Sequence, residues 1–251
     1  MDKESHPNTV LVAIPALDWR INASIATFLY QLAARSTDPT FGWQCSLAVV
    51  PEVSPVHYAR NLLVGIFLRE TNANALWFID NDMMPEPGAE KILESEADVV
   101  SGHCLATKLC PDGRISLRVT AYTERDEHGH FRGTPPLNDI PSPIVAAGAA
   151  NLLIRRRVLE DPRMHYDSSF LDLTGTQRSV LDDSPFAPPV FRTHFKPNGQ
   201  VQLSEDLDFV YRAHALGYRC LYDPRARMGH LKTADLNGIA QMLAVNKRVD
   251  S

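Results

Sequence analysis

The chain has 251 residues, a formal net charge of −5 and a sequence pI near 6.0. Hydrophobic residues make up 44% and charged residues 22%, which is ordinary for a folded domain with a sizeable core. The mild acidity argues against unaided binding to nucleic acid, because phosphate contacts need a basic patch. The polar start of the chain, the short apolar runs and four cysteines without a C-x-x-C pair predict a reduced, cytoplasmic protein with no membrane span.

Strand and helix patterns alternate through the first hundred residues. Short apolar runs predict strands over Thr9–Pro15 and over residues 45–53, 75–80 and 97–102. Between these runs, helical spacing predicts helices over residues 22–35, from Pro55 onward and from Pro87 onward. This alternation implies a parallel sheet with helices on both faces, and ligands of such sheets bind beyond the carboxyl ends of the strands.

The first two predicted helices carry recognisable start signals. Asn22 or Ser24 is expected to cap the first helix. Ser54 is expected to cap the second, with Pro55 at its first position. The spacing of its apolar residues predicts a buried face made of Ala59, Leu62, Leu63, Ile66 and Phe67.

The second half of the chain has a different character. Residues 111–143 are rich in turn signals and predict hairpins and loops, with 126–130 as a hairpin tip rather than a metal site. A strand is expected over about 150–154, followed by a short helix that opens at Arg155. Residues 161–203, rich in Pro, Ser and Asp, predict a long loop that covers the site as a lid.

The end of the chain returns to regular patterns. Ser204 is expected to cap a helix from Glu205 to about Leu216, which Gly217 ends. A strand beginning near Tyr218 and a short amphipathic C-terminal helix follow. No internal repeat and no sharp change of composition divides the chain into domains.

Two carboxylates end the third predicted strand, in the stretch ALWFIDNDMMPEPG over residues 75–88. In an extended segment the side chains of Asp80 and Asp82 point to the same side. Two carboxylates about 4 Å apart repel by roughly 4 kcal/mol at an effective dielectric constant of 20. A divalent cation removes that penalty, and Mg²⁺ or Mn²⁺ prefers such ligands. A solvated turn after a strand is an equally simple explanation, so the pair alone does not decide.

Other residues of catalytic type lie far from this pair in sequence. Arg60 lies early in the second predicted helix. It could supply a fixed positive charge to a ligand, or it could be an ordinary buried or surface arginine without a functional role. Glu205 and Asp206 lie in the first turn of a later helix, a position that favours acidic residues electrostatically in any protein. His230 follows the last predicted strand, although a lone histidine is more often a polar residue than a ligand. His103, Cys104 and Cys110 lack a fourth zinc ligand at a standard spacing and are expected in the core.

Taken in order, these stretches resemble the nucleotide-sugar glycosyltransferases of the GT-A fold, most closely the compact family-2-like enzymes of bacteria and phages. The matching segments are VLVAIPALDWR, SPVHYARNLL, WFIDNDMMPEP, GAANLLIRRRVLE, SEDLDFVYRAHALGYRCLYDP and MGHLKT. They cover roughly Thr9–Val100 and Ala147–Thr233, and no single motif among them is diagnostic.

The resemblance implies an α/β GT-A (Rossmann-like) fold, with a mostly parallel central sheet flanked by helices and a small antiparallel portion. It implies one domain over residues 1–251. Residues 9–102 would form the nucleotide-sugar-binding half, 103–233 the acceptor-side half and 234–251 a C-terminal helix and tail.

The resemblance also assigns roles to residues. The metal, Mn²⁺ or Mg²⁺, would be held by Asp82 and His230, with Asp80 close by. The donor, a UDP- or GDP-sugar, would be bound by Pro15, Asp18, Arg60, Asp80, Asn81 and Asp82. Asp206 of the E-D motif would be the general base of an inverting reaction, with Glu205 on the acceptor side. Apart from the resemblance, Lys108 after SGHCLAT is a candidate contact to the acceptor or to a phosphate. The acceptor hydroxyl is not identified, and the acidic charge gives no support to a modified DNA base.

The sequence departs from the family pattern in places, and two other protein classes share some of its features. Asn81 is less usual than Ala or Asp in the middle of the motif, and the Q-x-x-R-W motif and membrane spans of processive synthases are missing. A haloacid-dehalogenase-like phosphatase also ends a strand on D-x-D, but normally near its N-terminus and with Thr or Val after the motif rather than Met83. A non-catalytic sugar-nucleotide-binding protein is the other alternative, against which the intact Asp82, Asp206 and His230 argue.

Overall fold

The computed structural model of the protein describes residues 8–16, 18, 20–109, 115–136, 138–165 and 189–230. The predicted C-terminal helix and residues 166–188 of the predicted lid lie outside these ranges. No helix in the described ranges is both long and apolar enough to cross a membrane.

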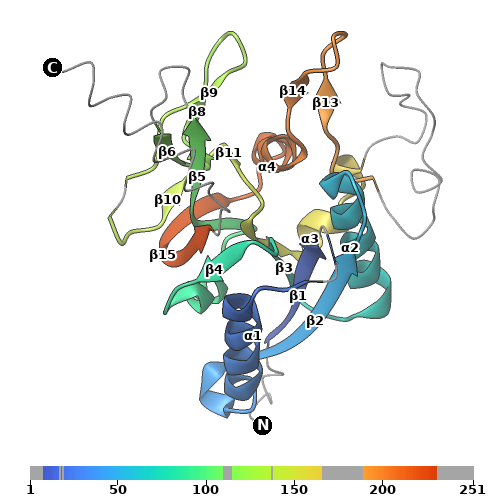
Figure 1. The fold of residues 1–251 in the computed structure, drawn as a ribbon, viewed down its shortest axis with the longest axis vertical. Coiled ribbons are helices and arrows are strands. Elements are labelled where there is room, and N and C mark those ends of the chain that lie inside the picture. The colour runs from blue at the N-terminus through green and yellow to red at the C-terminus, as the bar shows by residue number, and fades with distance from the viewer. Residues whose placement is uncertain are drawn as a thin grey trace, which may run out of the picture.

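The first part of the chain builds the parallel part of the sheet (Figure 1). Strand β1 (Asn8–Ala16) lies between β2 (Trp43–Pro51) and β3 (Ala75–Ile79), and it pairs with both in parallel. Helices α1 (Ala23–Arg35) and α2 (Val56–Glu70) connect these strands. The carboxyl ends of β1 and β3 therefore lie at the same edge of the sheet, as the alternation of patterns predicted.

The two connecting helices begin as their side chains dictate, with one correction. Asn22 caps α1, because its side chain accepts a hydrogen bond from the backbone N–H of Ile25. Pro55 is itself the N-cap of α2 rather than its first helical residue, and Ser54, joined to it by a cis peptide bond, makes no cap.

The buried face of α2 differs from the predicted one. Leu62 and Ile66 are only partly buried, whereas the polar residues His57, Arg60 and Asn61 are buried. A purely apolar spacing rule cannot anticipate this, because these polar side chains are buried only where distant residues satisfy their hydrogen bonds.

The other half of the sheet depends on a strand from the second half of the chain. Strand β12 (Asn151–Arg155) lies between β3 and β5 (Val99–Leu109) and is antiparallel to both. Strand β15 (Cys220–His230) pairs with β5 in parallel. The strand expected over residues 97–102 is thus present and longer than predicted, but β12 separates it from β3.

Short antiparallel strands complete the architecture. In the described part of the chain the main sheet has nine strands, in the order β10-β15-β5-β12-β3-β1-β2 with β4 on β15 and β6 on β5. The added strands are β4 (Met83–Pro85), β6 (Ile115–Val119) and β10 (Ser142–Pro143). Three small two-stranded sheets are formed by β7 (Ala121–Tyr122) with β11 (Ala146–Ala147), β8 (Glu124–Arg125) with β9 (Phe131–Arg132), and β13 (His194–Phe195) with β14 (Val201–Leu203).

The remaining helices are short except one. Pro87 does not begin an α-helix, and the segment after it forms a 3₁₀ helix instead. The 3₁₀ helices are η1 (Pro39–Phe41), η2 (Ala89–Glu94) and η3 (Pro162–Met164), and the α-helices are α3 (Arg156–Leu159) and α4 (Glu205–Ala215). Figure 1 shows α4 end-on between the β8–β9 and β13–β14 hairpins. Gly217 follows α4 with a φ of +88°, as its predicted role as a stop signal requires.

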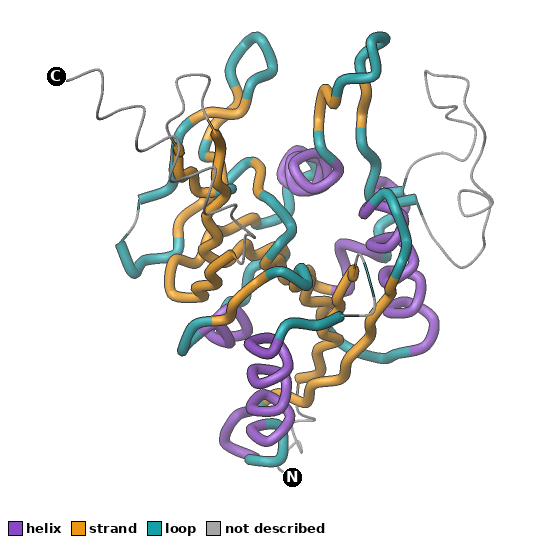
Figure 2. Tube along the Cα trace, in the orientation of Figure 1, coloured by secondary structure: helices purple, strands orange, loops and turns teal. Residues whose placement is uncertain are grey.

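Within the described residues, the buried apolar side chains form two clusters, one on each face of the sheet. Val10 and Val12 of β1 pack with α1, whereas Leu11 and Ala13 pack with α2 and α4. This is the alternation expected of a central strand that is buried on both faces. Helices on both sides of the sheet are visible in Figure 2. The predicted α/β class is confirmed: a central, largely parallel sheet is flanked by helices and accompanied by small antiparallel sheets.

Candidate functional site

The D-N-D stretch forms a turn at the carboxyl end of β3. The backbone N–H of Asp80 donates to the carbonyl oxygen of Ala150 (3.1 Å), and that of Met83 donates to the carbonyl oxygen of Asp80 (3.1 Å). Strand β4 begins directly afterwards, so Asn81 and Asp82 occupy the turn between β3 and β4. Both carboxylates are therefore at the sheet edge where ligands of such folds bind.

Asp82 contacts His230 across this edge. Strand β4 pairs with β15 so that Met83 lies opposite His230, and Asp82 Oδ2 lies 2.8 Å from His230 Nε2. The other ring nitrogen, Nδ1, lies 3.3 Å from the carbonyl oxygen of Leu105. A histidine that donates its Nδ1–H to a carbonyl presents Nε2 to a metal, and the same ring can instead donate Nε2–H to Asp82.

Arg60 joins Asp80 to the start of α4. Its Nη2 donates to Asp80 Oδ1 (2.8 Å), and its Nη1 forms an ion pair with Glu205 Oε1. Burial opposes the charged guanidinium, but the nearby carboxylates, with Asp206 among them, outweigh burial and raise the pKa of Arg60. Arg60 thus lies in the site, in contact with protein carboxylates.

The E-D pair begins α4, as predicted. Glu205 is buried, and burial raises the pKa of its carboxyl in spite of the opposing effect of Arg60. Thr193 Oγ1 donates to the second oxygen of Glu205 (3.3 Å). Asp206 Oδ2 accepts from the backbone N–H of Ala149 (3.4 Å), and Oδ1 accepts from that of Leu207 (2.8 Å). Asp206 is therefore oriented by two backbone N–H groups, one in α4 and one in the loop between β11 and β12.

Asn22 has a second role that the sequence pattern did not reveal. Its Nδ2 donates to the carbonyl oxygens of Asn81 (2.9 Å) and Met83 (2.7 Å). The residue that caps α1 therefore also holds the turn that carries Asp82. The available signal was a helix cap beside a turn that could hold a ligand. The capping role alone already explained an asparagine at this position, so the sequence did not predict the second role.

Three other predicted residues have no described contact with these carboxylates. Pro15 is buried in β1. Asp18 is exposed and accepts a hydrogen bond from the backbone N–H of Arg20 (2.9 Å). Lys108 lies on β5, and its side chain is outside the described part of the structure. Their roles in binding remain predictions.

Of the candidate metal ligands, Asp82 and His230 are in contact with each other, and they do not by themselves fill the coordination shell of a metal ion. No group of three or more His, Cys, Asp or Glu side chains in the described ranges is arranged to hold a metal ion. Residues 126–130 form the tip of the β8–β9 hairpin, as predicted, and Asp126 Oδ1 accepts there from the backbone N–H groups of His128 (3.0 Å) and His130 (2.8 Å).

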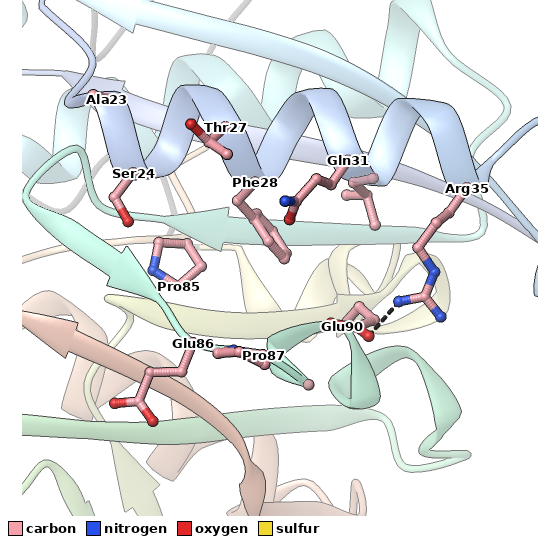
Figure 3. Close-up of a pocket in the computed structure, with 12 residues that line it drawn as sticks. Ala23, Ser24, Thr27, Phe28, Gln31, Arg35, Pro85, Glu86, Pro87 and Glu90 are labelled. Carbon is pink, nitrogen blue, oxygen red and sulfur yellow. Dashed lines mark hydrogen bonds and ion pairs between the residues drawn. The ribbon is translucent and has the colours of Figure 1, made fainter.

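A separate groove of about 700 Å³ runs along α1 (Figure 3). Phe28 and Pro85 line its apolar part, and an ion pair between Arg35 and Glu90 lies at one end. The carboxylates of the D-N-D turn and of the E-D pair do not line it. The groove is thus distinct from the site at the D-N-D turn.

Comparisons with solved structures found distant likenesses. No family model matches the chain, and no curated protein matches it. The solved structure of A197 from STIV is 15% identical with a TM-score of 0.47, covering 90% of this chain and 95% of its own. GalNAc-T7, solved with UDP, GalNAc and Mn²⁺, is 11% identical with a TM-score of 0.46, covering 91% of this chain and 44% of its own. HddC from Yersinia pseudotuberculosis, solved with GMP-PN, is 12% identical with a TM-score of 0.30, covering 61% and 79%. Likenesses of this size do not assign a function.

Proposed function

We propose that the chain is a metal-dependent glycosyltransferase that moves a sugar from a UDP- or GDP-sugar to an acceptor hydroxyl. The observation that carries the proposal is the contact of Asp82 with His230 at the carboxyl end of the parallel strands, 2.8 Å between Oδ2 and Nε2. The first aspartate of the motif, Asp80, and Glu205 of the E-D pair lie on either side of one arginine, Arg60. This arrangement supports a donor site and a candidate base at the edge where such sheets bind ligands.

The ligand atoms fit Mn²⁺ or Mg²⁺. A carboxylate oxygen and an imidazole nitrogen are ligands that Mn²⁺ accepts, and Mg²⁺ is commonly held by one or two carboxylates together with substrate phosphates. Asp82 and His230 would hold the ion, with Asp80 beside them. When bound, the cation would stabilise negative charge on the leaving diphosphate. The carbonyl oxygen of Leu105, 3.3 Å from His230 Nδ1, would orient the imidazole.

Asp206 is the proposed general base. The backbone N–H groups of Ala149 and Leu207 each occupy one lone pair of its carboxylate and fix its orientation. Each oxygen keeps a further lone pair that can accept the proton of the acceptor hydroxyl as that hydroxyl attacks C1 of the donor sugar. This assignment belongs to an inverting reaction.

A panel of nucleotide sugars tests the function. The purified protein is incubated with UDP- and GDP-sugars, with and without Mn²⁺, and the release of the nucleoside diphosphate is measured with candidate acceptors. Release that requires metal is the expected result. Nucleotide binding without release from any donor would indicate a binding protein, and release of inorganic phosphate from phosphomonoesters would indicate a phosphatase. Absence of both nucleotide binding and release would refute the proposal.

Two substitutions separate binding from chemistry. Asp206→Asn should lower turnover by roughly 10²–10⁴-fold, the usual contribution of a positioned base, with little change in UDP affinity. Asp82→Asn should weaken Mn²⁺-dependent UDP binding as well as turnover. Asp139→Asn, at an exposed position, is the matched control and should change neither. Near wild-type turnover in Asp206→Asn would show that the base is elsewhere or that the reaction is retaining.

A further inference from the structure

One arginine connects the two acidic motifs of the site. Arg60 of α2 reaches Asp80 of the D-N-D turn through Nη2 (2.8 Å) and Glu205, 145 positions away in sequence, through Nη1. The Arg60 side chain is 4% exposed, and that of Glu205 is 9% exposed. An arginine buried between two carboxylates has a fixed geometry, because its planar guanidinium cannot rotate without leaving one of them unpaired.

Arg60 is a poor candidate for a direct phosphate contact. Its two terminal nitrogens are already engaged by protein carboxylates, and its Nε is buried without a hydrogen-bond partner among the described residues. A phosphate could reach this guanidinium only by displacing a carboxylate or by entering the core. The family resemblance suggested that Arg60 contacts the donor directly, whereas its surroundings favour a role in holding the two protein carboxylates.

Asp80 is held by only one of its oxygens. Oδ1 accepts from Arg60, and within the described part of the chain no hydrogen bond to Oδ2 is present. The side chain of Asp80 is 26% exposed, whereas that of Arg60 is nearly inaccessible. One oxygen of this carboxylate is thus anchored, and the side chain as a whole is partly exposed.

Glu205 is held from its other side as well. Thr193 Oγ1 donates to Glu205 Oε2 (3.3 Å) and lies 3.2 Å from Nδ1 of His57, also on α2. One turn along that helix, Asn61 Nδ2 donates to the carbonyl oxygen of Phe191 (2.9 Å), and Asn61 Oδ1 accepts from the Phe191 N–H (2.8 Å). The first half of α2 therefore holds the segment that leads into α4.

We propose that Arg60 is a positioning residue that sets the distance between the nucleotide side and the acceptor side of the site. Arg60 holds Asp80 through Oδ1 and leaves Oδ2 for the metal-bound nucleotide. It also anchors Glu205, which keeps the neighbouring Asp206 at a fixed distance from Asp80. This inference rests on the proposed transferase function. It assigns to Glu205 an indirect role, exerted on the nucleotide site only through Arg60.

Coupling between the two carboxylates tests the inference. Asp80→Asn and Glu205→Gln are made singly and together, in the wild type and in Arg60→Met, and the affinity for UDP with Mn²⁺ is measured calorimetrically. Glu205→Gln alone should weaken UDP binding about 5-fold or more. In that variant Asp80 is the one charged partner left to Arg60 among the two, so Arg60 competes with the metal-bound nucleotide for Asp80. The loss of UDP affinity in the double variant should differ from the product of the two single losses by a similar factor, as expected for residues that share a partner.

The Arg60→Met background should remove that coupling. There, Glu205→Gln should change UDP affinity less than about 2-fold, because sites without a shared partner are close to additive. Since Arg60→Met leaves two carboxylates without a cation, Arg60→Lys is a second test if Arg60→Met does not fold. An ammonium group is a point charge and should not serve both carboxylates, so coupling should fall there too.

A matched control comes from another arginine paired with a buried aspartate. Arg157 pairs with Asp98, which immediately precedes β5 and therefore lies at the opposite edge of the sheet. Arg157→Met should leave UDP affinity and the coupling unchanged. If wild type binds UDP with Mn²⁺ but the two carboxylates are additive, or coupling persists without Arg60, the inference is refuted and the proposed function stands. If wild type binds neither UDP nor GDP, both fail.

Discussion

Replacing Asn22 should weaken two structures at once. Its Oδ1 caps α1 by accepting from the Ile25 N–H (2.9 Å), and its Nδ2 donates to the carbonyl oxygens of Asn81 and Met83. Loss of an N-cap costs about 1 kcal/mol, within a range of about 0.5–2 kcal/mol. Each of the two other hydrogen bonds contributes about 0.5–1.5 kcal/mol. Asn22→Ala should therefore lower the free energy of unfolding by about 2–4 kcal/mol.

The aspartate variant separates the two roles of Asn22. Asn22→Asp keeps an oxygen that can cap α1 but has no donor for the two carbonyl oxygens of the D-N-D turn. Its cost in stability should be at least that of the two lost hydrogen bonds, about 1–3 kcal/mol, because a carboxylate oxygen would then face both carbonyl oxygens. Both variants should bind UDP with Mn²⁺ more weakly, because the turn that carries Asp82 loses the same two hydrogen bonds in each.

Urea unfolding followed by circular dichroism measures the stability, and calorimetry measures UDP binding. Asp38→Ala is the control, because the Asp38 side chain caps η1 by accepting from the N–H and the hydroxyl of Thr40. It should cost about the value of a cap, roughly 1 kcal/mol, and leave UDP affinity unchanged. A cost below about 1 kcal/mol for Asn22→Ala, where three hydrogen bonds are lost, would refute the additive reasoning. Unchanged UDP affinity in both Asn22 variants would show that these bonds do not support the turn.

Two further predictions concern the core. A Cβ at Gly102 would lie 1.9 Å from Asn151 Nδ2 and 2.6 Å from the carbonyl oxygen of Ala226, so Gly102→Ala should destabilise the fold by at least about 3 kcal/mol in urea unfolding. Gly199→Ala, with nothing within 4 Å but a φ of +77°, should cost only about 1–2 kcal/mol. Burial raises the pKa of the Cys220 thiol to about 12, so this thiol should not react with a disulfide reagent at pH 8 until urea unfolds the chain. Because the folded pKa is the higher one, this thiol's contribution to stability should be lost as the pH rises from about 8.5 toward 12, and prompt labelling in the native state would contradict its burial.

Local patterns in the sequence determined much of the first hundred residues. The strands β1 and β3, the cap of α1 and the D-N-D turn follow from signals a few residues long: an apolar run, an Asn before a helical pattern, and carboxylates at a strand end. The same holds for α4, which begins at Glu205 and is followed by Gly217. Such features depend on contacts within one or two turns of the chain, so their cause is present in the local sequence.

The tertiary structure alone decided which distant segments are neighbours. Strand β12 enters between β3 and β5, and nothing in the periodicity of either neighbour marks that place. The polar face of α2 is buried because Arg60 meets Glu205, 145 positions away, and no apolar pattern records such a pairing. Periodicity shows which face of an element is apolar, but a buried polar residue is stable only beside the partner that the closed chain supplies, so that partner is known only once the chain is folded.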